Sequence, residues 1–218
     1  MTRLTLSFTR IFNEHHIIIA LVANFCKRGY YQFMILPLGP NPYTTHEHLL
    51  LHERKYVRFF KDKVLIHGAE KDYSYIDVDD SVGIVALNER GEVALVGQWR
   101  YPIKEYRWEI PAGMSEAGET PLENAKRELK EEAGVEAEDW LELGSFQMDG
   151  SKMNQRNHLF LARTLVVGEN APMEDEELMM KWLPLKDAIS LVEAGEIRDG
   201  FTVIGLLRVQ SFLQTMAQ

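Results

Sequence analysis

Residues 113–135 read GMSEAGETPLENAKRELKEEAGV, and the interpretation of the rest of the chain starts from this stretch. Its second half is a strong helix-forming sequence that carries Glu128, Glu131 and Glu132. Residues three and four apart share one face of a helix, so these three carboxylates project to the same side. Carboxylates this close repel one another unless a cation lies between them, and oxygen-only ligands favour hard cations such as Mg²⁺ or Mn²⁺. The stretch therefore predicts a divalent metal site on one helix face.

Both ends of this helix are marked in the sequence. Thr120 or Ser115 can cap its start, and Pro121 suits the first helical position. Gly134 suits the left-handed backbone conformation that ends many helices. An apolar stripe that can pack on a core is formed by Leu122, Ala125, Leu129 and Ala133. The sequence thus predicts an amphipathic helix between Thr120 and Gly134.

The spacing of the fixed positions distinguishes this stretch from an ordinary helix surface. A run such as Arg-Glu-Leu-Lys-Glu-Glu is by itself usually a solvated face. The whole stretch resembles the Nudix box, Gly-x5-Glu-x7-Arg-Glu-U-x-Glu-Glu-x-Gly-U, in which U is a bulky aliphatic residue. Every specified position is filled, by Gly113, Glu119, Arg127, Glu128, Leu129, Glu131, Glu132, Gly134 and Val135. The resemblance implies the Nudix fold and Mg²⁺-dependent hydrolysis of a nucleoside diphosphate linked to another group.

The resemblance also implies roles for residues of the box. Mg²⁺, with Mn²⁺ as a substitute, is expected to be held by Glu128, Glu131, Glu132 and the carbonyl oxygen of Ala112. Arg127 is expected to serve catalysis by orienting the glutamates through ion pairs, without touching the substrate. Gly113, Glu119 and Gly134 are expected to be structural, with Glu119 stabilising the loop or lying behind the metal ligands.

A glutamate outside the box is a candidate general base. In related hydrolases, a glutamate from the loop that precedes residue 178 closes over the site and helps to activate water. Glu176 is the first candidate for this role and Glu174 the second, and a box glutamate such as Glu131 is the remaining candidate. The ordinary alternative for the acidic run at residues 174–177 is a solvated loop.

Residues 98–102 and 108–113 lead into the box and resemble the same region of ADP-ribose and nucleoside diphosphate sugar hydrolases of the family. Arg100 is a candidate contact to the diphosphate or to a dimer partner, because a guanidinium matches phosphate geometry; its alternative is a surface ion pair. Trp99, Tyr101 or Trp108 can stack on a base or pack in the core. The predicted substrate-binding residues are Arg100, Trp99, Trp108, Glu109 and, from a later loop, Arg156.

The polar loop at residues 148–156 is expected to border the pocket. Arg156 and Lys152 can hold phosphate there, although solvated charge is the more frequent role of such residues. Related ADP-ribose pyrophosphatases usually carry a proline in this loop, where this chain has Gly150 and Ser151. The departure puts ADP-ribose itself in question and leaves other nucleotide sugars open.

The order of apolar segments predicts an α/β fold. Apolar runs at 81–87 and 92–100 flank a hairpin signal at residues 88–91, and further short strands are expected around the box. Those strands are predicted at 107–111, 140–146, 158–165 and 178–185, and helices at 186–194 and 201–216. With the resemblance, this order predicts a Nudix-type α/β/α sandwich with a mixed sheet, over residues 81–218.

A small antiparallel β segment is predicted ahead of this domain, at residues 49–80. Its strands are expected at 55–60, 63–67 and 73–78, with turn signals at Lys61-Asp62 and His67-Gly68. Similar strands in ADP-ribose pyrophosphatases of the family exchange between the partners of a homodimer, so the resemblance implies a homodimer. Residues 1–48 are interpreted as a leader and linker that need not belong to the mature fold.

Composition and charge limit the classes of binding partner and the cellular compartments that fit this chain. A net charge of −9 argues against nonspecific nucleic-acid binding. The apolar run at residues 17–25 is too short to span a membrane as a helix, and the single Cys26 excludes an internal disulfide. A cytoplasmic protein is predicted. The alternatives are export to the periplasm, with residues 1–26 as a signal peptide, and a misassigned start ahead of Met34.

These features together predict metal-dependent hydrolysis of the diphosphate bond of ADP-ribose or a nucleoside diphosphate sugar, giving a nucleoside monophosphate and a sugar phosphate. One alternative is a regulatory Nudix domain that binds a nucleotide sugar without turnover, against which the intact box argues. The other is a hydrolase that removes oxidised nucleoside triphosphates. The residues that lead into the box favour diphosphate substrates over this second alternative.

Overall fold

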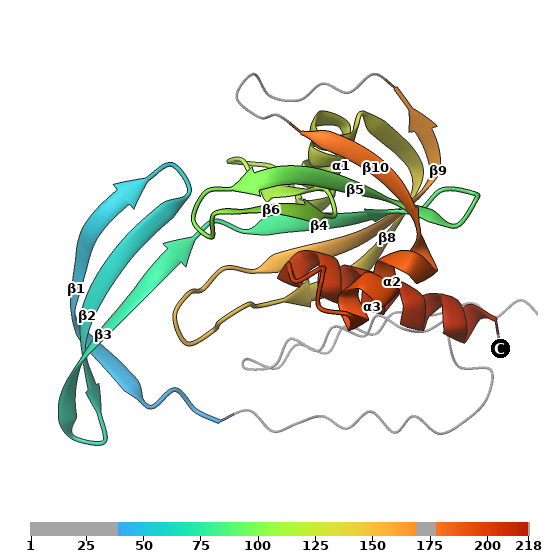
Figure 1. Ribbon diagram of the computed structural model, residues 1–218. Coiled ribbons are helices and arrows are strands. Elements are labelled where there is room, and N and C mark those ends of the chain that lie inside the picture. The colour runs from blue at the N-terminus through green and yellow to red at the C-terminus, as the bar shows by residue number, and fades with distance from the viewer. Residues whose placement is uncertain (1–38, 169–177, 218) are drawn as a thin grey trace, which may run out of the picture. The chain divides into compact units, whose positions relative to one another are not determined.

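Two β-sheets form the centre of the part of the chain that carries the box. The computed structural model describes residues 39–168 and 178–217 (Figure 1). One sheet has the strand order β7-β4-β9-β8 and the other the order β10-β5-β6. The strands are β4 (Ser81–Ala86), β5 (Glu92–Arg100), β6 (Glu105–Glu109), β7 (Ala112–Met114), β8 (Val135–Phe146), β9 (Asn157–Val167) and β10 (Met179–Pro184). Strands β4 and β9 run parallel and β8 runs antiparallel to β9, so the four-stranded sheet is mixed, as predicted.

The turn between β4 and β5 marks the point where the two sheets separate. The backbone N–H of Asn88 donates to Glu92 O at 2.9 Å, and Leu87 forms an isolated antiparallel bridge with Val93. The predicted hairpin turn therefore exists, but the two strands do not continue as a hairpin. Strand β4 pairs with β7 and β9, whereas β5 pairs with β6 and β10. All six residues of β4 are buried, as a central strand requires.

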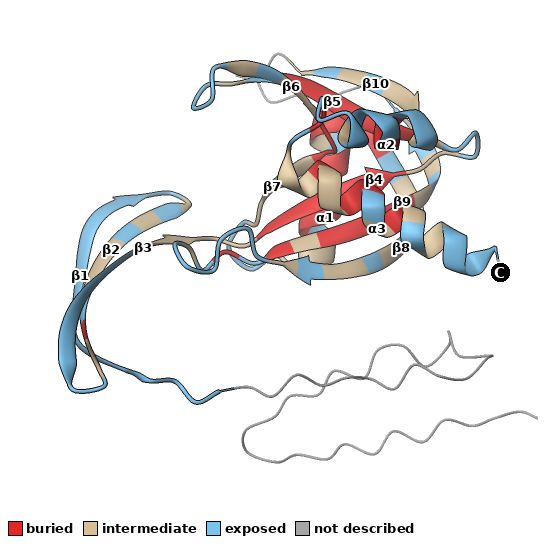
Figure 2. Cartoon of the chain, turned by 60° about the horizontal axis from the view of Figure 1, so that its bottom comes forward, coloured by how far each residue is buried: buried red, intermediate tan, exposed pale blue. Residues whose placement is uncertain are grey.

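Helices cover the sheets on two sides, which makes the predicted α/β/α sandwich. Helix α1 (Pro121–Ala133) packs in one apolar cluster, whose members include Val82, Ile84, Ala125, Leu129 and Ala133. Helices α2 (Leu185–Glu193) and α3 (Gly200–Met216) pack in a second cluster, whose members include Val85, Leu159, Leu161, Ala188 and Leu206. Successive residues of a strand point to opposite faces, so β4 supplies both clusters. Figure 2 shows the buried residues concentrated in the central strands.

The ends of α1 follow the sequence signals. Thr120 caps the start: its hydroxyl accepts from Glu123 N at 3.3 Å, while the Glu123 carboxylate accepts from Thr120 N at 2.8 Å. This reciprocal pair satisfies two backbone donors that a helix start leaves open. Gly134 ends the helix with φ 63°, a left-handed conformation that a glycine adopts without strain. The cap is therefore Thr120, and Ser115 lies in the preceding loop.

A separate antiparallel sheet precedes the sandwich, with the order β1-β2-β3. Its strands are β1 (Tyr43–Arg54), β2 (Val57–Ile66) and β3 (Ala69–Val78). The turn expected at Lys61-Asp62 is wrong, because β2 is one continuous strand there: Lys61 pairs with Leu49 on one side and Ser74 on the other. Strand β1 had not been predicted, and each of its residues is exposed. Within the described residues, no helix is long and apolar enough to cross a membrane.

Candidate active site

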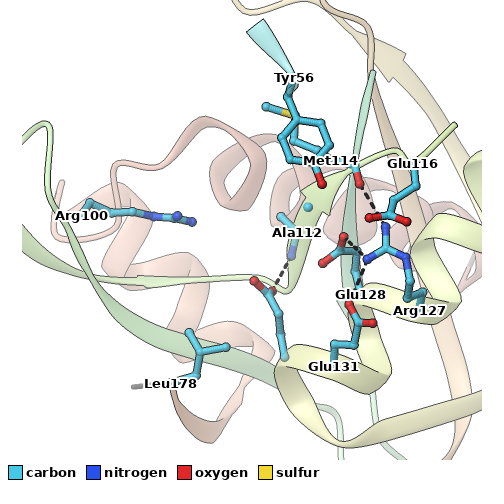
Figure 3. Close-up of a pocket in the computed structure, with 11 residues that line it drawn as sticks. Tyr56, Arg100, Ala112, Met114, Glu116, Arg127, Glu128, Glu131 and Leu178 are labelled. Atoms are coloured by element: carbon cyan, nitrogen blue, oxygen red, sulfur yellow. Dashed lines mark hydrogen bonds and ion pairs between the residues drawn. The ribbon is translucent and has the colours of Figure 1, made fainter. Parts of the chain in front are cut away.

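A cavity of about 250 Å³ opens beside α1 and β7, on the face that carries the box glutamates (Figure 3). Helix α1 contributes its polar face, and the loop that leads into it contributes backbone and short side chains. The lining residues are Tyr56, Arg100, Ala112, Gly113, Met114, Glu116, Arg127, Glu128, Glu131, Glu132 and Leu178. The structure thus brings the expected metal ligands and Arg100 to one cavity.

Arg127 lies at the centre of a hydrogen-bonded network. Its Nη1 donates to Glu128 at 2.7 Å and to Glu131 at 2.9 Å, and its Nε donates to Glu119 at 2.8 Å. Its Nη2 donates to the carbonyl of Met114 at 3.0 Å. The hydrogen bond with Glu119 is the main cause that raises the pKa of Arg127, and the same bond lowers the pKa of the Glu119 carboxyl. These are the ion pairs expected of an arginine that orients the glutamates.

Two of the glutamates are held against the strand that precedes the helix. Glu128 is buried, and a Cβ at Gly113 would lie 2.1 Å from the Glu128 carboxyl carbon, so a larger residue there would displace the carboxylate. Glu132 is also buried, and its carboxylate accepts from Ala112 N at 2.8 Å. Burial raises the pKa of Glu128, against the opposing effect of Arg127. A buried carboxylate of this kind gains most from a cation that shares its site.

The donor set fits a hard divalent cation. Glu128, Glu131 and Glu132 supply carboxylate oxygens, and Ala112, whose carbonyl is the fourth expected ligand, lines the same cavity. In the described residues, no three acidic, His or Cys side chains converge closely enough to hold an ion without rearrangement. The reason is visible in the contacts: Arg127 draws Glu128 and Glu131 toward itself, while Glu132 turns to Ala112 N.

Arg100 reaches the cavity from the end of β5. Its Nε donates to both carboxylate oxygens of Glu109, at 3.2 and 3.1 Å, and Nη2 pairs with Glu109 as well. Burial lowers the pKa of Arg100, but the hydrogen bonds to Glu109 and the attraction of Glu109, Glu132 and Asp199 together outweigh burial, so the pKa is raised. Glu109 is buried, so it fixes a guanidinium at the cavity wall. In Figure 3, Arg100 projects toward the cavity from the side opposite Glu128 and Arg127.

Comparison with known proteins identifies the family. A model described as NUDIX domain matches residues 78–202, more than half of the chain. The chain belongs to the Nudix family of hydrolases. It is 33% identical over 141 residues to the ADP-ribose pyrophosphatase of Mycobacterium tuberculosis, covering 63% of this chain and 68% of that protein. It is 31% identical over 154 residues to the ADP-ribose pyrophosphatase of Bacillus subtilis, covering 70% and 83%.

A solved structure supports the fold. The crystal structure of an ADP compounds hydrolase superposes with a TM-score of 0.73 at 21% identity, covering 83% of this chain and 98% of that one. This likeness shows that the sandwich and the preceding sheet together follow a known Nudix arrangement. It also supports the mixed-sheet α/β class predicted from the order of apolar segments.

Two tryptophans expected at the Nudix substrate site lie on the other face of the β5–β6 ribbon. Trp99 pairs with Tyr106 and Gly97 pairs with Trp108. Because neighbouring residues of a strand point to opposite faces, Trp99 points away from the face of Arg100, and Trp108 away from the face of Glu109. Trp99 is exposed, and Trp108 lines a second cavity of about 430 Å³ beside α2. Neither is among the residues that line the acidic cavity.

The loop at residues 148–156 packs on β3, contrary to the expectation that it borders the Nudix pocket. Ile76 N donates to Lys152 O at 2.8 Å, and Val78 N donates to the side-chain oxygen of Asn154 at 3.0 Å. Arg156 is exposed, and its backbone N–H donates to Asp80 at 3.1 Å. Arg156 and Lys152 are absent from the cavity lining, because the open backbone groups of β3 hold the loop elsewhere. A phosphate-binding role for Arg156 stays a prediction.

Tyr56 lines the cavity, although the sequence did not predict it as a site residue. Tyr56 comes from the turn between β1 and β2, and its ring points into the cavity in Figure 3. Its neighbour Lys55 donates to Glu116 at 3.2 Å, which ties this turn to the loop of the box. No local pattern marks Tyr56, because it is far from the box in sequence. The candidate bases Glu174 and Glu176 lie outside the described residues.

Proposed function

We propose that this protein uses Mg²⁺ to hydrolyse the diphosphate bond of ADP-ribose or a related nucleoside diphosphate sugar. For ADP-ribose the products are AMP and ribose 5-phosphate, and for another sugar they are a nucleoside monophosphate and a sugar 1-phosphate. The observation that carries the proposal is the cavity that combines three carboxylates on one wall with Arg100 on the other. Relatives named ADP-ribose pyrophosphatase, matched over most of the box-bearing part, support the diphosphate substrate class.

The metal site of the proposal consists of Glu128, Glu132, Glu131 and the Ala112 carbonyl. When bound, Mg²⁺ supplies charge neutralisation for the diphosphate and lowers the pKa of a coordinated water. Mn²⁺ is expected to substitute, because it also prefers oxygen ligands. Gly113 lets the Glu128 carboxylate lie directly against the β7 backbone, which fixes its position before the ion arrives.

The protein side chains divide the remaining tasks. Arg127 holds Glu128 and Glu131 in place, so that their oxygens are oriented before the substrate arrives. Arg100, fixed by Glu109, presents N–H groups to a phosphate oxygen and stabilises the charge that develops on it. Water adds to one phosphorus, and the bridging P–O bond to the other phosphate breaks.

A carboxylate is proposed as the base that takes the proton of the attacking water. Glu131 is half-buried in the cavity lining, and its ion pair with Arg127 can be exchanged for a water contact. Glu176 remains the other candidate from the sequence. Glu131 is also assigned to the metal, so the Glu176→Gln variant distinguishes the two. If Glu176 is the base, this variant should lower kcat by about 10²–10⁴-fold with little change in KM; if Glu131 is the base, kcat should stay close to wild type.

The test is product formation from a panel of ADP-ribose, ADP-glucose, GDP-mannose, UDP-glucose and dGTP. Each reaction contains Mg²⁺, with and without EDTA, and the products are separated by anion-exchange chromatography. Selective, EDTA-sensitive cleavage of one diphosphate is the expected result. Cleavage of dGTP alone would instead favour a hydrolase that removes oxidised nucleoside triphosphates. Tight binding of a nucleotide sugar without cleavage would favour a regulatory domain.

A homodimer is part of the proposal, and the exposed sheet β1–β3 is its support. Apolar side chains exposed on this sheet include Tyr43, Leu49, Leu50, Leu51, Val57, Phe59 and Tyr73. A three-stranded sheet that leaves this much apolar surface open gains stability from a covering partner. Light scattering should give twice the monomer mass, and Leu51→Glu should shift it toward the monomer. The division into residues 1–48, 49–80 and 81–218 and a cytoplasmic location stay predictions.

A further inference from the structure

Asn124 is a fully buried polar side chain in the first turn of α1, one turn before the metal-site glutamates. Its side-chain oxygen accepts from Arg127 Nη2 at 2.8 Å. Its side-chain nitrogen donates to the hydroxyl of Ser115 at 2.8 Å. A buried amide is costly unless both ends are paired, and here both ends are. The box motif leaves this position open, so nothing in the motif explains the asparagine.

The contacts of Arg127 show what the amide contributes. A guanidinium has five N–H donors in a rigid plane, so fixing one edge fixes the other. Asn124, Glu119 and the carbonyl of Met114 hold the Nη2 edge. The Nη1 edge is then turned toward Glu128 and Glu131, which it meets at 2.7 and 2.9 Å.

The chemistry of the position favours an amide over the obvious alternatives. Arg127 already contacts three carboxylates, those of Glu119, Glu128 and Glu131. Asn124 adds a neutral acceptor, which orients the guanidinium without another negative charge. Its N–H group meanwhile anchors Ser115, the residue that directly follows β7, and Ser115 N donates to Asp80 O at 2.8 Å. The amide therefore joins Arg127 to the strand that abuts Glu128 and Glu132.

We propose that Asn124 is a positioning residue that sets the affinity of the site for its divalent cation. It acts through Arg127, by holding the guanidinium where it presents Glu128 and Glu131 in one orientation. This inference rests on the proposed function, because it takes these glutamates as metal ligands. Residues behind a metal site commonly change metal affinity about 10–100-fold when they are lost; Asn124 acts one contact further out, so about 3–10-fold is expected.

The experiment measures Mn²⁺ binding directly, by the loss of the free Mn²⁺ paramagnetic resonance signal in the full-length protein. Asn124→Leu keeps the branching of the side chain and removes the acceptor, so the Mn²⁺ dissociation constant should rise about 3–10-fold. Asn124→Asp keeps an acceptor oxygen for Arg127 but adds a negative charge, so its loss of Mn²⁺ affinity should be smaller than that of Asn124→Leu. Ser115→Ala, which leaves the contact to Arg127, is the matched control and should have the smaller effect.

Kinetics give a second readout. For Asn124→Leu, the Mg²⁺ concentration for half-maximal activity should rise while kcat at saturating Mg²⁺ stays close to wild type. Unchanged Mn²⁺ binding in Asn124→Leu would overturn the positioning role, as would equal losses in the Leu and Asp variants. Failure of the wild-type protein to bind Mn²⁺ at all would overturn the proposed metal site itself, and with it this role.

Discussion

Helix α1 and the sheet β1–β3 differ in how their polar side chains are held. On α1, Glu128, Glu132 and Asn124 are buried, and Arg127 joins the carboxylates to the loop before the helix. On the sheet, every residue of β1 is exposed, and ion pairs such as Lys63–Glu47 lie at the surface. Exposed ion pairs contribute little to stability, whereas buried networks fix one geometry.

This difference indicates that α1 and the sheet β1–β3 have separate roles. The helix and its loop supply a preorganised constellation for chemistry, and its parts come from one short stretch of sequence. The sheet reaches the same cavity with one side chain, Tyr56, and with the exposed pair of Lys55 and Glu116. Changes in the helix network should therefore affect turnover, and changes in the sheet should affect substrate affinity or stability.

Among substitutions that leave the net charge unchanged, Gly113→Ala is expected to have the largest effect on kcat/KM. In Gly113→Ala the new Cβ would lie 2.1 Å from the Glu128 carboxyl carbon, so Glu128 must move. A displacement of about 1 Å in a catalytic group can cost about 10²-fold, so kcat/KM should fall by about that factor. Gly150→Ala is the control, since its Cβ meets only Gln147, at 3.6 Å. Steady-state kinetics and thermal unfolding of both variants test this, and wild-type activity in Gly113→Ala would contradict it.

Removal of Arg100 should cause the next largest loss of kcat/KM. Arg100→Met takes away the hydrogen bonds of the buried Glu109 and the cation of the cavity wall. We expect kcat/KM to fall about 10–100-fold, and the free energy of unfolding to fall by about 1–3 kcal/mol for the unpaired carboxylate. Arg163→Met, which breaks the Arg163–Asp139 pair on β8 and β9, is the matched control for activity.

A double variant separates the two effects of Arg100. Arg100→Met combined with Glu109→Gln should recover stability, because the charge that was left unpaired is removed. Activity should stay low. Recovery of activity together with stability would show that Arg100 acts only through the fold.

Substitution of Tyr56 at the cavity should have a smaller effect, on KM alone, and substitution of Tyr101 at the β5–β6 turn should have almost none. Tyr56 lines the cavity, whereas Tyr101 is exposed and absent from its lining. Loss of one aromatic contact is worth about 0.5–1.5 kcal/mol, so Tyr56→Ala should raise KM about 3–10-fold with kcat nearly unchanged. Tyr101→Ala should leave KM within about twofold. The reverse order would mean that the exposed β5–β6 face binds the substrate.

The smallest expected effect is a pH dependence of the stability of the sheet β1–β3. Burial raises the pKa of Asp77, but hydrogen bonds from Arg58 and Asn154 outweigh it and hold the pKa below its usual value. The folded state therefore favours ionised Asp77, which stabilises the sheet above the ordinary pKa of about 4. This contribution is lost as the pH falls through the lowered pKa.

Asp77→Asn tests the sign of this dependence. The difference in unfolding free energy between wild type and variant should be below about 1 kcal/mol at pH 7 and should vanish near pH 2. Turnover at pH 7 should be unchanged. A stability difference that grows on acidification would contradict the assignment.

The sequence was sufficient for the box helix because its signals are local. Thr120, Pro121 and Gly134 define its ends through short-range hydrogen bonds and backbone conformation, and the ion pair of Arg127 with Glu131 follows from helical spacing. The strands of the sandwich were also predictable, because buried strands read as apolar runs. The family resemblance then supplied the expected layer arrangement.

The parts that could not be predicted depend on contacts distant in sequence. Strand β1 has no alternation of buried and exposed residues, since both of its faces are open. Lys61-Asp62 reads as a turn, yet pairing on both sides keeps β2 continuous. The contribution of Tyr56 and the packing of the 148–156 loop on β3 likewise require the folded chain.

Strand geometry separates two pairs of the predicted substrate-binding residues. Trp99 follows Gln98 and precedes Arg100, so the alternation of β5 places the tryptophan and the arginine on opposite faces. The same alternation in β6 separates Trp108 from Glu109. A substrate role for the two tryptophans stays a prediction.

The most direct test of the central claim is the turnover of Glu132→Gln beside wild type, on the substrate that the panel selects. Glu132 accepts from Ala112 N at 2.8 Å, and glutamine keeps an oxygen for that hydrogen bond, so the fold should be retained. The account predicts a loss of kcat of about 10³-fold or more at saturating Mg²⁺, with a melting temperature within a few degrees of wild type. Full activity in Glu132→Gln would contradict the claim that this face of α1 holds the catalytic metal.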